Sequence, residues 1–337
     1  MPVQTVVEGA ADIVLRRLGL LRVVRALDTQ AGVLRILGYH RVCDPNGDPL
    51  NGDPNVISAT PSGFADQIRV LARHYAPVGW PELEASLEHG RPLPRKAVLV
   101  TFDDGYRDFL THAAPVLKAH RVPAVLFVPT AFPGTGRRFW WDEVWQQVSQ
   151  AAAITVDIAG IGAVDLRLAG ARWQLVRQIV RQLRPLRPEA IQARINELRV
   201  ALGATPGGPA SVLTWAELRD LMGQGVTIAS HGCSHASLPA LTVDEIRADI
   251  EQSQRDLRRE LGAAPGVFAY PFGHYDDRAA GMLKAHGFLA AFSTRPGRNA
   301  LPVGNRYSLL RHTVNITHTM SRLQFGLSGF YRSAGSR

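Results

Sequence analysis

The chain contains few of the residues and patterns that define several common classes of protein. It has two cysteines in 337 residues, Cys43 and Cys233, and no Cys-x-x-Cys pair, so the sequence predicts no disulfide framework. No run approaches the roughly 20 apolar residues that a membrane-spanning helix needs. The first residues also lack the basic-then-apolar order of a secretory signal. We therefore expect a cytoplasmic protein, and the two thiols are consistent with a reducing compartment.

Lysine is also scarce, so nearly all of the positive charge is arginine. The formal net charge is +9 and the sequence pI is about 10.1. A surface of this sign favours polyanions such as nucleic acid, anionic lipid head groups or acidic sugars. The basic residues are scattered and no nucleic-acid-binding motif accompanies them, so we expect no nucleic-acid partner. An arginine-rich proteome would explain the same composition without a functional cause.

Residues 11–27 mix apolar side chains with four arginines and predict a basic amphipathic helix inside an N-terminal segment, 1–30. Such a helix either docks on its own domain or lies on an anionic membrane surface. In the second case the cytoplasmic protein would be peripherally associated with a membrane.

Residues 31–337 alternate apolar runs with amphipathic stretches, which predicts strands and helices in turn. This order predicts a parallel sheet with helices packed on it. Ser62 is expected to cap the first helix, and Thr214 with Glu217 forms a capping box. The expected strands are 33–39, 98–102, 124–128, 226–230, 267–270, 289–292 and 307–310. The expected helices are 62–74, 81–88, 106–120, one from Thr214, 243–261 and 278–286.

Residues 134 to about 210 break this rhythm. An aromatic-rich helix start, a β-like stretch over 154–168 and helices over 172–184 and 189–201 follow one another. We interpret them as a mostly helical insertion in a single domain that spans 31–337. Trp140 and Trp141 either belong to the core of the insertion or form a platform for a sugar.

Two adjacent carboxylates, Asp103 and Asp104, directly follow the apolar strand 98–102. Neighbouring residues of a strand point to opposite sides, so the pair can share one site only where the backbone turns. Gly105 permits that turn. The arrangement offers one carboxylate to a metal and leaves the other free to move a proton. The alternative interpretation is a solvated Asp-Asp-Gly turn.

His231 and His235 follow the strand 226–230 with a spacing of four residues. If the segment is helical, both imidazoles lie on one face, and Cys233 points away from them. Two histidines and one carboxylate leave metal positions open for water and substrate. The alternative is two capped surface histidines. His40 and His312 also follow expected strands, and in a parallel barrel the carboxyl ends of the strands meet at the active-site face.

Three motifs in combination resemble those of a known family. Thr101-Phe102-Asp103-Asp104-Gly105, His231-x-x-x-His235 and Tyr270-Pro271-Phe272-Gly273 resemble the first three motifs of the polysaccharide deacetylases, the NodB-homology family 4 carbohydrate esterases. The resemblance covers about residues 33–315. The opening 36–42, with Tyr39-His40-Arg41-Val42, is similar to the subgroup that includes poly-N-acetylglucosamine deacetylases, and the insertion is similar to members found with exopolysaccharide and lipopolysaccharide synthesis.

The resemblance implies an α/β fold, a distorted (β/α)7 barrel, that removes N-acetyl or O-acetyl groups from sugars. It implies that Asp103 is the general base. Asp104, His231 and His235 would bind Zn²⁺ or another divalent ion such as Co²⁺ or Ni²⁺. The general acid would be either His312, in the late motif Leu310-Arg311-His312, or His40, as expected for the subgroup. Of the two, we favour His40.

The sequence departs from the family at one position, because the arginine expected two residues before Pro271 is Ala269. That arginine orients the base, and Arg311 or Arg107 are the candidates to replace it. Substrate contacts are expected from six residues: Tyr106, through a backbone N–H near it, Pro271, Phe272, Gly273, Arg311 and Trp141.

The sequence thus predicts a metal-dependent enzyme that removes N-acetyl groups from an amino-sugar glycan or a lipid-linked sugar. A hydrolase of another ester or amide, such as an O-acetyl, formyl or cyclic-imide substrate, is the first alternative. A non-catalytic glycan- or lipid-binding protein on the same fold is the second, and the intact Asp103 argues against it. The sequence does not distinguish a finished polymer from a lipid-linked intermediate, and it does not specify the sugar, the linkage or the metal.

Overall fold

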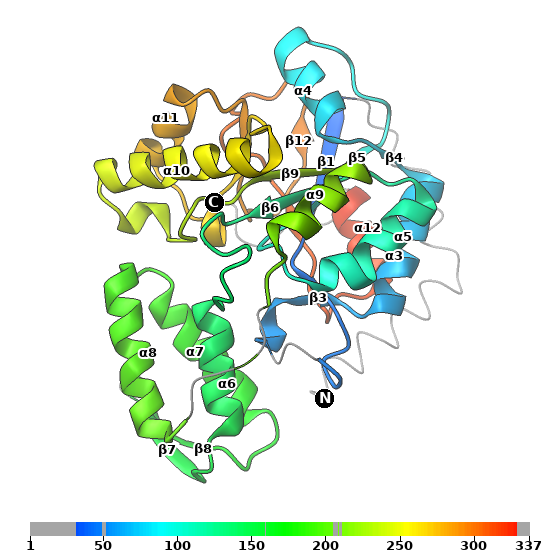
Figure 1. The fold of residues 1–337 in the computed structure, drawn as a ribbon. Helices are drawn as coiled ribbons and strands as arrows, with labels where there is room; N and C mark the ends of the chain where they lie inside the picture. The colour runs from blue at the N-terminus through cyan, green and yellow to red at the C-terminus, as the bar shows by residue number, and fades with distance from the viewer. Residues whose placement is uncertain (1–31, 49–51, 159, 205–207, 209–210, 329–337) are drawn as a thin grey trace.

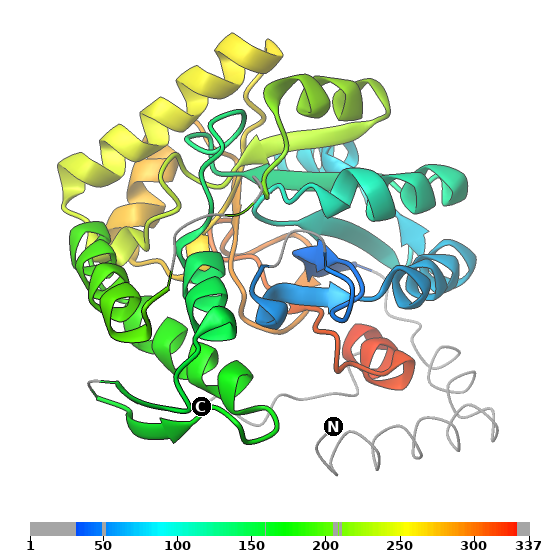
Figure 2. The same cartoon turned by 60° about the horizontal axis from the view of Figure 1, so that its bottom comes forward.

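The computed structural model describes residues 32–48, 52–158, 160–204, 208 and 211–328. Its centre is a curled nine-stranded sheet in the order β11-β10-β9-β6-β5-β1-β12, with β13 also paired to β1 and β4 to β5 (Figures 1 and 2). All these pairs are parallel except β1 with β12. The strands of this sheet are β1 (Val33–Tyr39), β4 (Ala76–Pro77), β5 (Ala97–Phe102), β6 (Ala124–Val128), β9 (Val226–Ser230), β10 (Val267–Ala269), β11 (Ala290–Phe292), β12 (Asn299–Ala300) and β13 (His312–Thr313).

Segment 309–313 closes the curve of the sheet. Leu309 forms a parallel bridge with Phe292 of β11, and β13 pairs with Leu37 and Gly38 of β1. The predicted last strand over 307–310 is therefore wrong in position. The segment 309–313 pairs with β11 at its start and with β1 at its end, instead of forming one strand along a single neighbour. The predicted α/β architecture, a distorted (β/α)7 barrel with a mostly helical insertion, is confirmed by the fold.

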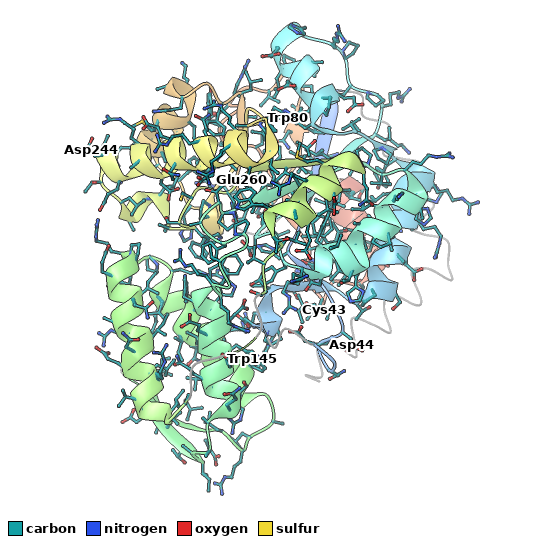
Figure 3. The ribbon with its side chains drawn as sticks, viewed as in Figure 1. Cys43, Asp44, Trp80, Trp145, Asp244 and Glu260 are labelled. Carbon is teal, nitrogen blue, oxygen red and sulfur yellow. The ribbon has the colours of Figure 1, made fainter. Side chains whose placement is uncertain are left out.

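Helices surround the outer face of the sheet (Figure 1). Figure 3 marks the two ends of α10, which packs on β9, with Asp244 and Glu260. Within the described residues, no helix combines the length and the apolar character that crossing a bilayer requires. The helices are α3 (Pro61–His74), α4 (Trp80–His89), η2 (Phe109–Ala113), α5 (Ala114–His120), α9 (Trp215–Gly223), α10 (Val243–Leu261), α11 (Asp277–Ala285) and α12 (Met320–Ser328), with short turns η1 (Pro54–Val56), η3 (Leu238–Ala240) and η4 (Pro271–Gly273).

Two predicted helix starts are corrected. Helix α3 is capped by Thr60, whose hydroxyl accepts from the Gly63 amide at 3.1 Å, so Ser62 is not the cap. The helix expected from residue 106 begins only with the π-helical turn η2, because the backbone at 105–107 is hydrogen-bonded to 211–213. The capping box of Thr214 and Glu217 at the start of α9 is present as predicted.

Side chains alternate between the two faces of the sheet as strand geometry requires. Leu34 and Ile36 of β1 join Leu99 of β5 in the inner apolar cluster. Leu37 and Tyr39 join Phe102 and residues of α3 in the outer cluster. This alternation decides which polar residues face the interior of the barrel at the ends of the strands.

The insertion forms a separate helical layer beside the barrel and has its own apolar cluster (Figure 1). It contains α6 (Trp140–Gln150), the antiparallel hairpin of β7 (Thr155–Ile158) and β8 (Gly162–Asp165), α7 (Ala171–Leu183) and α8 (Pro188–Leu202). A two-stranded pair, β2 (Arg41–Val42) with β3 (Ile57–Ala59), lies next to the barrel mouth. The predicted N-terminal helix over 11–27, and the segment 1–30, lie outside the described residues.

Candidate active site

The tandem aspartates lie where β5 ends. The amide of Asp103 donates to the carbonyl of Tyr39 at 2.9 Å, so the sheet register places Asp103 beside His40 at the end of β1. Asp104 has a φ of +74° and Gly105 a φ of +69°. The turn thus begins at Asp104, one residue before Gly105, where the sequence analysis predicted it. A left-handed conformation at a non-glycine residue is strained, and here it turns the second carboxylate back to the same side as the first.

His231 and His235 are brought together by an irregular loop and not by a helical turn, so the helical interpretation of this segment is wrong. His235 has a φ of +59° and Gly232 a φ of +76°. Asp249 of α10 anchors the loop by accepting from the amides of Cys233 and Ser234, each at 2.8 Å. A Cβ at Gly232 would lie 2.6 Å from an Asp249 carboxylate oxygen, which explains the glycine there.

Asp104, His231 and His235 converge on one point. All three are buried, and one ligand atom of each lies within 4.8 Å of the others. The Asp104 Oδ1 is 3.5 Å from Nε2 of His231 and 3.1 Å from Nε2 of His235. Because the carbonyl of Ala269 can only accept, its 2.7 Å contact with Nδ1 of His231 assigns a proton to Nδ1, so that in the neutral ring the lone pair is on Nε2.

These residues fit a divalent cation. The buried Oδ1 of Asp104 accepts no hydrogen bond from any described residue, although two imidazoles face it. Burial lowers the pKa of His235, which favours the neutral ring. Burial would also lower the pKa of His231, but the contacts of that ring with Asp104 and the charge of Asp103 outweigh it and raise the pKa. Burial would raise the pKa of Asp104, but its contacts with the two histidines hold it well below the usual range. Lone pairs that face one another in a buried site are stabilised by a metal between them, and the set of two imidazoles and one carboxylate suits zinc.

Asp103 does not join this cluster. Arg311 donates from its two terminal nitrogens to the two carboxylate oxygens of Asp103, each at 2.7 Å, and from Nε to the carbonyl of Ser293 at 2.8 Å. Burial would raise the pKa of Asp103, but the attraction of Arg311 outweighs it and holds the pKa below its ordinary value. A bidentate pair also fixes the orientation of the carboxylate.

Arg311 is therefore a support for Asp103 and not a substrate contact. Its side chain is completely buried and does not line the cavity, which corrects the expectation that it contacts substrate. Arg107, the other candidate for this support, forms an ion pair with Glu217 at the surface. Of the two candidates, the structure places only Arg311 beside Asp103.

The two candidate acids lie in different places. Nε2 of His40 is 4.0 Å from Oδ2 of Asp103, and the side chain is 23% exposed at the cavity. His312 faces the outer side of the sheet, where its Nδ1 would lie 3.3 Å from a Cβ at Gly326 of α12. Because Arg311 faces inward, strand alternation turns His312 outward. The structure does not bring His312 to the site.

A cavity of about 220 Å³ opens beside these groups. The rings of Trp141 and Phe272, which are 5.7 Å apart, form part of its wall. Trp140 lies behind this wall, with its ring 6.1 Å from that of Phe272. The cavity is lined by His40, Asp53, Asn55, Val56, Asp103, Asp104, Trp141, Arg184, His231, His235, Phe272, Thr294, Thr313, Val314 and Asn315.

Tyr106, Pro271 and Gly273 do not line the cavity, and the contact expected from a backbone N–H near Tyr106 stays a prediction. Tyr106 is fully buried; its hydroxyl donates to Asp142 at 3.1 Å and accepts from Nε1 of Trp141 at 2.8 Å, so its side chain holds the tryptophan in place. Pro271 is buried, and Gly273 packs closely against Thr294. Of the Pro271–Gly273 segment, only Phe272 lines the cavity.

Sequence reasoning missed Asp53 and Arg184. Asp53 lies in the turn-rich segment 44–55, and burial raises its pKa to about 6. Arg184 belongs to the insertion, directly after α7. No motif identifies either residue, because each reaches the cavity only through the packing of its segment against the barrel.

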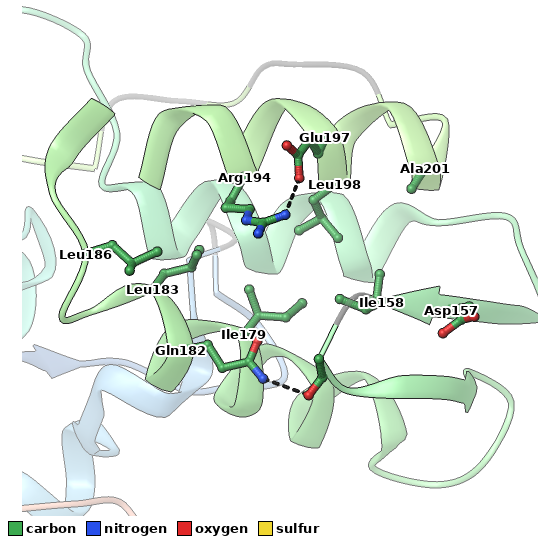
Figure 4. A pocket seen from close by; sticks show the side chains of 11 residues that line it. Asp157, Ile158, Ile179, Gln182, Leu183, Leu186, Arg194, Glu197, Leu198 and Ala201 are labelled. Carbon is green, nitrogen blue, oxygen red and sulfur yellow. Dashed lines mark hydrogen bonds and ion pairs between the residues drawn. The ribbon is translucent and has the colours of Figure 1, made fainter. Parts of the chain in front are cut away.

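A larger cavity, of about 500 Å³, lies inside the insertion between the hairpin, α7 and α8 (Figure 4). Its lining is mainly apolar, with residues such as Ile179, Leu183 and Leu198. The charged groups at its edge include Arg194, which donates to Glu197 at 2.7 Å. Its lining includes no histidine or cysteine, so it lacks the chemistry of the first cavity.

The curled parallel sheet thus carries, at one end, an Asp-His-His cluster with the donor atoms to hold a metal, beside an arginine-supported aspartate. Residues 90–291 match the family described as polysaccharide deacetylase. This match covers more than half of the chain, and the protein belongs to that family.

Comparison with known proteins agrees with this membership. The chain is 27% identical over 263 residues to poly-β-1,6-N-acetyl-D-glucosamine N-deacetylase of Escherichia coli strain K12, over 77% of this chain and 34% of that protein. It thus spans about a third of the length of this relative. Two solved structures share the fold at low identity. The deacetylase PplD of Streptococcus pyogenes has a TM-score of 0.59 at 18% identity, covering 88% of this chain and 99% of that one. IcaB of Ammonifex degensii has a TM-score of 0.56 at 20% identity, covering 89% and 98%.

Proposed function

We propose that the protein hydrolyses the N-acetyl group of an amino-sugar residue in a glycan, with a divalent metal held by Asp104, His231 and His235. The observation that carries the proposal is the position of Asp103, beside the three converging ligand atoms and outside them. A protein that only bound glycans would have no need of a buried carboxylate oriented by a buried arginine. The activity for which the Escherichia coli relative is named, N-deacetylation of a polysaccharide, supports the same reaction.

The chemistry is divided between a metal and the chain's own residues. When bound, Zn²⁺ or a similar ion such as Co²⁺ or Ni²⁺ would polarise the acetamide carbonyl and lower the pKa of water. Asp103, kept ionised by Arg311, accepts a proton from the water that attacks that carbonyl. His40 lies 4.0 Å from Asp103 and donates a proton to the sugar nitrogen as the carbon–nitrogen bond breaks. The products are acetate and a free amine.

The substrate class is an N-acetylated glycan or lipid-linked sugar. The cavity supports this assignment because the aromatic side chains of Trp141 and Phe272 form part of its wall, and an aromatic wall suits the apolar faces of a sugar ring. The cytoplasmic, membrane-peripheral location remains a proposal based on the sequence pattern over 11–27. No nucleic-acid partner is proposed.

Acetate release from N-acetylglucosamine oligomers by the zinc-loaded protein tests the proposal. Replacing the base by Asp103→Asn should lower kcat by about a thousandfold or more, with the zinc content unchanged. His40→Gln should lower kcat by about a hundredfold, whereas His312→Gln should retain most of the activity. Release of formate or O-linked acetate from matched compounds, with none from N-acetyl sugars, would favour the alternative hydrolase, and no release from any of them would refute catalysis.

A further inference from the structure

Arg184 is the only arginine or lysine among the cavity-lining residues in the part of the chain that the structure describes. It follows the last residue of α7, and its side chain is half-buried. Its Cζ lies 5.6 Å from the centre of the Phe272 ring, so the guanidinium is positioned over a wall of the cavity. The insertion thus contributes one permanent positive charge to the site on the barrel.

Apart from its contact with the Phe272 ring, this guanidinium has no hydrogen-bond or ion-pair partner among the described residues. The Nε of Arg184 is buried and makes no hydrogen bond, and no carboxylate of the described chain forms an ion pair with the side chain. Other arginines of the insertion do have such partners: Arg187 pairs with Glu245, and Arg194 with Glu197. A partly buried cation without a hydrogen-bond acceptor is unfavourable, so Arg184, which lines the substrate cavity, has unused hydrogen-bonding capacity.

The charges nearest to Arg184 restrict where a ligand anion can lie. Asp104 attracts it, but that carboxylate belongs to the proposed metal ligands. Asp53 also attracts it, while its Oδ1 already accepts from the amide and the side chain of Asn55, at 2.9 and 2.6 Å. His274, whose ring is 6.1 Å from that of Phe272, is close enough to Arg184 that burial and, second to it, this arginine lower its pKa. Neither carboxylate forms an ion pair with the guanidinium in the described chain, which leaves this cation of the cavity lining to a ligand anion.

We infer that Arg184 binds an anionic group, a phosphate ester or a carboxylate, carried by the amino sugar or by the residue next to it. A planar guanidinium recognises both groups through paired hydrogen bonds. The inference deepens the proposed function and rests on it: the substrate is an acidic or phosphorylated glycan and not a neutral amino-sugar polymer. The two sources of the anion are a sugar phosphate, as in a lipid-linked intermediate, and a uronic acid in the glycan chain.

Acetate release from three substrates separates these cases. They are a neutral N-acetylglucosamine trimer, N-acetylglucosamine 1-phosphate, and a tetrasaccharide that alternates N-acetylglucosamine with glucuronic acid. The wild type should show at least about a tenfold higher kcat/KM for one of the two anionic substrates than for the neutral trimer. The preferred substrate then identifies the source of the anion, a sugar phosphate or a uronic acid. Arg184→Gln should lower kcat/KM for that substrate at least about tenfold more than for the trimer, and Arg184→Lys should restore part of the difference.

Arg181→Gln is the matched control, since Arg181 is an exposed arginine in the last turn of α7, just before Arg184, and does not line the cavity. It should leave all three rates within about twofold of the wild type. Equal losses in Arg184→Gln on charged and neutral substrates, or no preference in the wild type, would overturn the inference while leaving the deacetylase activity intact.

Calorimetry with the slow variant Asp103→Asn tests the inference without turnover. N-acetylglucosamine 1-phosphate should bind at least about tenfold more tightly than N-acetylglucosamine, and adding Arg184→Gln should abolish the difference. Recognition of an anion would be refuted by two results together. In both Asp103→Asn and the double variant with Arg184→Gln, N-acetylglucosamine 1-phosphate would bind no more tightly than N-acetylglucosamine, and the wild type would show no preference for the uronic-acid substrate in acetate release. If no substrate releases acetate, the proposed function fails, and the affinity difference still decides whether Arg184 binds an anion.

Discussion

Arg311 holds Asp103 by two parallel hydrogen bonds of 2.7 Å, across 208 positions of sequence. The family's arginine two residues before Pro271 is absent, and Ala269 in its place uses its carbonyl to orient His231 instead. The support of the base therefore comes from the segment that closes the barrel, directly before β13. Gly38 of β1 passes close to this arginine, since a Cβ there would make ordinary van der Waals contact with the guanidinium at 3.7 Å.

Replacing Arg311 should impair turnover and stability without removing the metal. Arg311→Gln leaves the buried Asp103 charge without its partner, and breaking a buried pair in this way costs about 3–5 kcal/mol of unfolding free energy. We expect kcat to fall by about a hundredfold in the folded protein while zinc content stays near one per chain. Arg311→Lys keeps the charge but loses the bidentate geometry, and should fold while still lowering kcat.

Arg107→Gln is the control, since its pair with Glu217 is partly exposed and should contribute less than about 1 kcal/mol. Unchanged turnover in both Arg311 variants would show that Asp103 does not depend on this arginine.

Zinc should stabilise the folded protein through Asp104, His231 and His235. A ligand that binds only the folded state, at a hundredfold above its Kd, adds about 2.7 kcal/mol, which corresponds to a rise in Tm of roughly 5 °C for a domain of this size. Thermal unfolding of the chelator-treated protein, with and without added zinc, measures this rise. His235→Gln should remove most of it, while the exposed His89→Gln should leave it unchanged. A rise of equal size in His235→Gln would place the zinc elsewhere.

His312 should make the protein sensitive to acid. Burial, with smaller effects of Arg298 and Arg35, lowers the pKa of His312 from its ordinary 6.5 to about 4. The unfolded chain therefore takes up this proton first as the pH falls. The stabilisation is complete above pH 6.5 and is lost as the pH falls from 6.5 to 4, at up to about 1.4 kcal/mol per pH unit for one proton.

Urea unfolding of His312→Gln at several pH values between 4 and 7 measures this effect. The variant should show a shallower decline of the unfolding free energy in that range, although His318, whose pKa burial also lowers to about 4, will still contribute. A slope as steep as that of the wild type would mean that His312 is not the residue that takes up the proton.

Gly273 should tolerate no side chain. It has a φ of +73°, and a Cβ there would lie 2.7 Å from the Cβ of Thr294, a residue of the cavity wall. Gly273→Ala should therefore lower the unfolding free energy by about 1–3 kcal/mol. A Cβ added at Gly281, inside α11, would meet no atom within 4 Å, so Gly281→Ala should raise stability by about 0.5–1 kcal/mol. Equal effects of the two substitutions would show that the close contact with Thr294 relaxes without cost.

The sequence alone was sufficient for the local elements. Apolar periodicity gave the bounds of β1, β6, β9 and α10 as the structure has them, because these segments are long or uniformly buried. It also placed the chemistry-bearing residues at the ends of strands, and the motifs indicated the family. These features depend on the order of neighbouring residues, which a sequence states directly.

Only the tertiary structure decided which side chains meet. The parallel register of β1 and β5 sets His40 beside Asp103, and alternation along segment 311–312 turns Arg311 inward and His312 outward. The packing of the insertion on the barrel delivers Arg184 to the cavity. The loop that joins His231 to His235 depends on Asp249 from a neighbouring helix. Such contacts form between segments far apart in the chain. A local sequence pattern predicts neither the register between two strands nor the residues at which the backbone takes a positive φ.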